Sequence, residues 1–226
     1  MFEFPKIHSF PPFYTKQRNA TILENQLEAW GALILDYCEH FRIFSILDSG
    51  TVLVQQQPQE LPPLFENKLI ERAVLDEFRK EIFAHLVSKL GRAAYVDPKK
   101  RDAGILLFWR TPAEWAALIR EHVESTGQLG TVLTVYELTK LEETDPLLRN
   151  IDYNLFVRAI DVLMKQGKAQ VLKAEDGSSQ IGGVKIIWSA CFQPCAILIV
   201  NVHLWREQIQ HATGVSFTFI FHKCGL

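Results

Sequence analysis

Two groups of side chains in this sequence have the residue types needed to bind a metal ion. They are Glu142, Glu143 and Asp145, and Cys191, Cys195, His203 and His211. The first group lies in a proline-containing loop without the alternating register of a calcium loop, so we interpret it as a solvated loop. The spacing of the second group fits no common zinc pattern. We therefore expect no metal site.

Motifs of the common catalytic classes are absent from the full sequence. It contains no glycine-rich loop ending in Lys-Ser/Thr, no His-Glu-x-x-His and no Gly-x-Ser-x-Gly. These motifs carry phosphate binding, zinc proteolysis and serine hydrolysis, respectively. We predict a chain that is not an enzyme and needs no cofactor.

The sharpest functional feature is a segment of prolines and aromatic residues near the N-terminus. Adjacent prolines favour polyproline II backbone, and aromatic anchors with a phenolic tip suit docking into a partner. We predict an extended docking arm over residues 1–18. The residues of this pattern are Phe10, Pro11, Pro12, Phe13 and Tyr14.

Two other interpretations of this segment stay open. The aromatic side chains could fold back onto the chain's own first helix. Alternatively, Pro11, Pro12 and Tyr14 form a Pro-Pro-x-Tyr pattern, which WW domains bind. That pattern has only four positions, so its specificity is low.

The composition is that of a globular protein. The 226 residues include 24 basic and 26 acidic side chains, for a net charge of −2, and 48% are hydrophobic. The length suits one large domain or two small ones. Because counterion release requires a clear basic excess, the charge balance argues against a protein that mainly coats nucleic acid or anionic lipid.

The last 38 residues differ from the rest of the chain. Residues 189–226 contain three charged side chains but three of the four cysteines. We predict that this tail is either a poorly ordered extension or the product of incorrect gene-model reading. Its apolar stretch is too short and interrupted to span a bilayer. With no secretory signal at residues 1–10, we expect a cytoplasmic chain in which the remaining cysteine, Cys38, is a buried thiol.

Apolar periodicity predicts four main helices before the tail. They cover about 27–40, 75–90, 112–127 and 152–167, a shorter helix is expected over 65–71, and a helical turn is expected over 135–139. Thr111, Pro112 and Glu114 form a strong helix start, and Asp152 is suited to cap the last helix. We expect strands at 43–47, 93–96, 105–109, 131–133 and 184–188.

The sequence contains a duplication. Lys89, Gly91 and an apolar strand are matched by Lys165, Gly167 and a second apolar strand, with the two lysines 76 residues apart. Each copy has the order helix, short strand, helix, helix, strand, turn, strand, which is that of a winged helix. We predict an α+β chain, mostly helical with small wings, containing winged-helix domains at 19–110 and 111–188.

A winged helix that reads duplex DNA needs basic and amide side chains on the exposed face of its third helix. In the first unit Arg79 and Lys80 are offset by Asp76 and Glu77, and the second unit is similarly balanced. We therefore favour a protein-interaction module. A nucleic-acid-binding or transcription-associated protein is the alternative.

Several sequence elements resemble the family of the smallest subunit of the ESCRT-II complex, the vacuolar protein sorting-associated protein 25 family. They appear in family order before the tail. The matching elements are 10–15, 26–30, 35–38, 63–67, 108–115, 136–139 and 183–185. The loop from Ser49 to Leu61 is longer than the family leads us to expect, and residues 189–226 have no counterpart.

This resemblance implies a non-enzymatic tandem winged-helix subunit, present in two copies per complex. The N-terminal arm and first winged helix would dock on the two larger ESCRT-II subunits. The docking residues that the resemblance implies are Phe10, Pro11, Pro12, Phe13 and Tyr14, with help from Phe4 and Pro5. The second winged helix, within 131–188, would recruit an ESCRT-III subunit for sorting ubiquitinated cargo into multivesicular bodies. The resemblance further implies a cytoplasmic protein recruited peripherally to endosomal membranes through its complex, without direct nucleic-acid binding.

Overall fold

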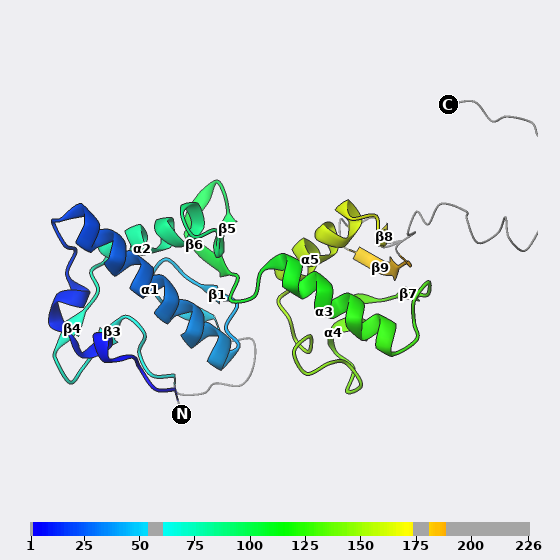
Figure 1. The fold of residues 1–226 in the computed structure, drawn as a ribbon, viewed down its shortest axis with the longest axis horizontal. Coiled ribbons are helices and arrows are strands. Elements are labelled where there is room, and N and C mark those ends of the chain that lie inside the picture. Colours follow the sequence, from blue (N-terminus) through cyan, green and yellow to red (C-terminus); the bar gives the residue numbers. More distant parts are fainter. Residues whose placement is uncertain (1, 54–60, 174–180, 189–226) are drawn as a thin grey trace, which may run out of the picture. The chain divides into compact units, whose positions relative to one another are not determined.

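The computed structural model describes residues 2–53, 61–173 and 181–188 (Figure 1). Helices alternate with short antiparallel strands in these residues, which confirms the predicted α+β class. The described residues up to Ile187 belong to one compact unit, in which we call residues 2–110 the first half and 111–187 the second half. The tail at 189–226 and the centre of the Ser49–Leu61 loop lie outside the described residues.

The first half is built around α1 (Ala20–Phe41). The Asn19 side chain caps it by accepting hydrogen bonds from Thr21 N and Ile22 N, and this N-cap starts the helix earlier than the apolar stripe alone predicts. In the apolar stripe that predicts this helix, Leu27, Trp30, Ile34 and Tyr37 are buried and Phe41 is half-buried. Cys38 is fully buried, as expected. Beside α1 lie α2 (Asp76–Ser88) and a sheet of order β2-β1-β6-β5. Its strands are β1 (Ser45–Ile46), β2 (Val52–Leu53), β5 (Ala93–Asp97) and β6 (Lys100–Leu107).

The second half follows the predicted order of elements. Its helices are α3 (Pro112–Ser125), α4 (Val135–Thr139) and α5 (Tyr153–Lys165). Its sheet contains β7 (Val132–Leu133), β8 (Ala169–Lys173) and β9 (Ile181–Ile186) in the order β7-β9-β8. The predicted capping box is present at Thr111 and Glu114, and Asp152 caps α5.

The first half departs from the predicted repeat by an added strand, β2, and at the short helix. The helix expected over 65–71 is wrong, because a hairpin of β3 (Glu66–Asn67) and β4 (Arg72–Ala73) stands there. Asn67 Oδ1 accepts a hydrogen bond from Leu69 N and closes a turn, while Glu71 adopts a positive φ of 50°. Both features interrupt helical backbone locally. The duplication is therefore preserved in outline, with one helix replaced by a hairpin.

The strand boundaries in the two wings also differ from the prediction. β6 starts at Lys100, so the first turn is shorter than expected, and β9 ends before Trp188. Trp109 and Trp115 are buried, whereas Trp188 is 67% exposed. Gly104 has φ +90° at the point where β6 passes β1, and a Cβ there would lie 2.2 Å from Ile46 O.

The N-terminal arm is not extended. It forms two 3-10 turns, η1 (Lys6–Ser9) and η2 (Pro11–Tyr14), joined by extended backbone at Phe10. The predicted polyproline II conformation is therefore wrong. The φ that proline fixes also suits a 3-10 helix, and contacts with α1 select that alternative. None of the described helices combines the length and the apolar composition that a membrane span requires.

Candidate docking surface

The arm is attached to α1 by a stacked aromatic pair. The rings of Phe13 and Trp30 are nearly parallel, with centroids 4.2 Å apart and an interplanar angle of 6°. The indole Nε1 of Trp30 also donates a hydrogen bond to Phe13 O at 3.0 Å. Both side chains are buried. The ring and the backbone of Phe13 are thus held by the same α1 residue.

Gln26, one turn earlier on α1, holds the backbone of η2. Its Nε2 donates to Phe13 O at 2.8 Å, to Thr15 O at 3.0 Å and to Pro12 O at 3.3 Å. Its Oε1 accepts a hydrogen bond from Gln17 N. A buried amide therefore satisfies polar groups where the arm turns onto α1.

A second anchor joins η1 to η2 and to the β3–β4 hairpin. Tyr14 Oη donates to His8 O at 2.9 Å, and Asn67 Nδ2 donates to the same carbonyl at 2.9 Å. The His8 ring stacks on Phe4 with centroids 4.0 Å apart. Burial lowers the pKa of His8 and raises the pKa of Tyr14 to about 12, since it disfavours the charged form of each.

Three neighbouring residues among those predicted to bind a partner face solvent. Phe10 is 56% exposed, and Pro11 and Pro12 are exposed next to it. Pro5 is also exposed, and Phe4 is half-buried. An exposed aromatic side chain beside two prolines offers an apolar surface of fixed conformation. The structure therefore places Phe10, Pro11 and Pro12 together at the surface.

Phe13 and Tyr14 occupy different positions from these three residues. They are 3% and 2% exposed, respectively, so the interpretation in which aromatic side chains fold back onto the first helix describes them correctly. A WW domain would have to extract Tyr14 from this packing to bind the Pro-Pro-x-Tyr pattern. The burial of Phe13 and Tyr14 could have been inferred from the regular apolar stripe of α1, in which Trp30 offers a large surface for packing.

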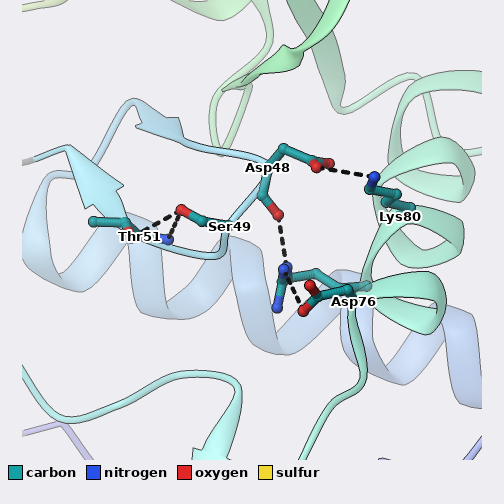
Figure 2. Close-up of polar contacts among 6 residues, drawn as sticks. Asp48, Ser49, Thr51, Asp76 and Lys80 are labelled. Carbon is teal, nitrogen blue, oxygen red and sulfur yellow. Dashed lines mark hydrogen bonds and ion pairs between the residues drawn. The ribbon is translucent and has the colours of Figure 1, made fainter.

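The cationic side chains of α2 are engaged with the β1–β2 turn. Asp48 and Lys80 face each other across 3.3 Å, and Asp76 lies on the same side of α2 (Figure 2). Arg79 Nε donates to Asp48 O at 2.8 Å, and its Nη2 lies 2.9 Å from Asp76 Oδ1. This pairing lowers the positive charge that α2 presents to solvent.

The second half exposes several large apolar side chains within the region that the resemblance assigns to a partner. They are Val132, Tyr136, Leu141, Tyr153, Met164 and Leu172. In the described residues no group of three or more histidine, cysteine or acidic side chains could hold a metal. The Cys191 to His211 group lies outside the described residues.

Comparisons with known proteins agree on one family. The profile of the family described as "ESCRT-II complex subunit" matches residues 7–152. Vacuolar protein-sorting-associated protein 25 of Danio rerio is 33% identical over 78% of this chain and 95% of its own length, and the Homo sapiens protein is 34% identical over 78% and 94%. The Arabidopsis thaliana protein is 31% identical over 81% and 95%.

Solved structures give the same result. The crystal structure of subunit VPS25 of the endosomal trafficking complex ESCRT-II has a TM-score of 0.71 and 27% identity, covering 81% of this chain and all of the solved chain. A chain in the crystal structure of endosomal complex ESCRT-II (VPS22/VPS25/VPS36) has a TM-score of 0.69 and 27% identity, covering 83% of this chain and all of that chain.

Proposed function

This chain belongs to the family of ESCRT-II complex subunits, and on that premise we propose that it is a non-enzymatic assembly subunit that docks on the two larger subunits of an ESCRT-II complex. A similar solved complex contains VPS22, VPS25 and VPS36. We assign this chain the place of the VPS25 subunit, in two copies per complex. Matches that cover more than nine-tenths of the relatives' own length support this assignment.

The observation that carries the docking proposal is the exposed run Phe10-Pro11-Pro12 on a folded arm. Phe10 supplies an aromatic anchor, and the prolines keep the backbone beside it in one conformation. Such anchors contribute much of the affinity in protein interfaces. Phe13 and Tyr14 hold this surface in position through α1 and η1, rather than contacting the partner themselves. Phe4 and Pro5 extend the surface.

For the second half we propose a separate partner, an ESCRT-III subunit, which this chain would recruit during sorting of ubiquitinated cargo into multivesicular bodies. Exposed apolar side chains on α4, α5 and the β7-β9-β8 sheet support a partner-binding role in the second half. We propose domain boundaries of 19–110 and 111–188. The complex would act in the cytoplasm, recruited peripherally to endosomal membranes.

Co-expression of the full chain with the two larger subunits tests this assignment. The complex would be purified through a tag on one larger subunit, and its mass measured by sedimentation equilibrium. We expect a mass that accounts for two copies of this chain and one of each partner. Failure of the chain to co-purify would overturn the assignment, and a mass with one copy would overturn the stoichiometry.

The nucleic-acid alternative is disfavoured by the ion pairs of Lys80 and Arg79, because they reduce the charge available for phosphate contacts. Titration of the chain with duplex DNA at two salt concentrations distinguishes the two functions. If the chain acts in assembly, it should show no salt-sensitive binding to duplex DNA. An affinity that falls steeply as salt rises would favour the alternative.

A further inference from the structure

Arg42 makes a contact that joins the two halves of the chain. It follows α1 in a left-handed backbone conformation, with φ 55° and ψ 45°. Its Nη1 donates to Pro146 O at 2.5 Å, and its Nη2 donates to Leu147 O at 2.7 Å and to Arg149 O at 3.0 Å. One side chain at the end of the first helix therefore holds three carbonyl groups of the loop between α4 and α5.

The loop presents these carbonyls from a conformation that its own contacts fix. Arg149 Nη2 donates to Glu142 O at 2.7 Å and to Thr144 O at 3.1 Å. Thr144 Oγ1 donates to Glu137 O, and Asp145 Oδ1 accepts from Leu147 N. Leu148 packs in the core, only 1% exposed. Arg42 therefore binds an acceptor set that belongs to the fold of the second half.

The geometry requires an arginine at this position. A guanidinium carries five donors in a planar fork, so two of its nitrogens can serve three separate acceptors. A lysine would offer one ammonium group on a flexible stem. Partial burial lowers the pKa of Arg42, and the nearby Asp145 opposes that shift by favouring the cation.

A second contact between the halves lies around an aromatic cluster. Trp109 and Trp115 meet edge to face with centroids 4.9 Å apart, and Phe44 packs against both. Trp109 Nε1 also donates to Ile43 O. An apolar contact alone permits small rotations, because dispersion attraction has little directionality. The directed hydrogen bonds of Arg42 form a second attachment, which removes this rotational freedom between the halves.

We propose that Arg42 is a positioning residue that fixes the orientation of the second half on the first. By doing so it sets the direction in which the surface of the second half faces when the N-terminal arm is docked. The orientation itself follows from the contacts within this chain. Its consequence for recruiting an ESCRT-III subunit rests on the proposed function.

Residual dipolar couplings of the weakly aligned full chain test the orientation directly. In the wild-type protein, amide couplings from α1 and α2 should fit the same alignment tensor as those from α3 and α5. In Arg42→Ala the two halves should require tensors of different magnitude. Arg72→Ala, which removes an exposed arginine on β4, is the matched control and should retain the single tensor.

A single shared tensor in a well-folded Arg42→Ala protein would overturn the proposal. If Arg42→Ala loses its dispersed amide spectrum, the same measurement is made on Arg42→Lys. This variant retains the positive charge and the aliphatic stem, so it is expected to disturb the fold less. A shared tensor in Arg42→Lys would then show that the guanidinium fork is not required.

The functional consequence needs a second measurement on the assembled complex. Complexes containing Arg42→Ala should assemble normally but support less ESCRT-III assembly than wild type, whereas the free variant should bind the isolated ESCRT-III subunit as wild type does. Unchanged ESCRT-III assembly would overturn this functional consequence, whereas the orientation is tested by the alignment tensors alone. The tensor measurement uses no partner, so failure of the proposed function would leave its outcome interpretable.

Discussion

The Phe13 ring lies parallel to the Trp30 ring, with centroids 4.2 Å apart, while the Trp30 indole donates a hydrogen bond to the Phe13 carbonyl oxygen. A residue of the N-terminal arm is thus part of the core around α1. The exposed Phe10-Pro11-Pro12 run begins three residues before it and is held by this attachment. A partner that binds this run meets a preorganised surface, which lowers the entropy cost of ordering on binding.

Replacement of Phe13 by alanine should destabilise the chain by about 3–5 kcal/mol, since a buried aromatic ring is lost and leaves a cavity. Phe10→Ala is the matched control, because the same ring is removed from a 56% exposed position. Its effect should stay within about 0.5 kcal/mol. Urea unfolding of both variants checks the difference. Equal destabilisation by the two changes would show that Phe13 does not pack as described.

Stability should depend on pH through His8. Burial lowers the folded-state pKa of His8, so the unfolded chain takes up its proton first as the pH falls. The stabilising contribution is therefore present above the ordinary histidine pKa of about 6.5 and is lost as the pH falls through the folded-state value. Urea unfolding at about pH 7.5 and about pH 5.5 should show a smaller change in the free energy of unfolding for His8→Gln than for wild type.

His40→Gln provides the control for this pH dependence, because His40 is exposed on α1. It should retain the wild-type difference between the two pH values. The role assigned to His8 would be wrong if His8→Gln and wild type lost the same free energy on acidification.

Gly104 should tolerate no side chain. In Gly104→Ala, the new Cβ would lie 2.2 Å from Ile46 O in a residue with φ +90°. Gly91→Ala is the matched comparison, with φ +61° and no atom within 4 Å of the new Cβ. The second change should cost about 1–2 kcal/mol from left-handed backbone strain. Thermal unfolding should show a clearly larger loss for Gly104→Ala, and similar losses would argue against the close approach of β1 and β6.

Local sequence signals predicted the four main helices and the order of elements in the second half. The Thr111 capping box and the Asp152 cap act within one helical turn, so their residue types are sufficient to locate α3 and α5. The sequence order also predicted the duplication. The hairpin at β3 and β4 was missed because Asn67 combines a local turn with a hydrogen bond to His8, a residue distant in the sequence.

The candidate site was predicted only in part, because it also depends on contacts between residues distant in the sequence. The residue types of Phe10, Pro11 and Pro12 suggested docking, and their exposure is consistent with it. The conformation of the arm depends on contacts that the segment itself does not encode, such as Gln26 Nε2 with Phe13 O. Arg42 gave no sequence signal, because its acceptors lie 104 to 107 residues away.

The affinity of this chain for the preassembled pair of larger ESCRT-II subunits tests the central claim most directly. It would be measured for wild type and for the variant Phe10→Ala/Pro11→Ala/Pro12→Ala, with thermal unfolding of each to confirm an intact fold. An aromatic anchor that contributes at least about 2 kcal/mol to the binding free energy is lost in this variant. The affinity should therefore weaken by about 30-fold or more. An affinity within about twofold of wild type would contradict docking through the arm, because the loss of a single anchor should change the affinity by much more.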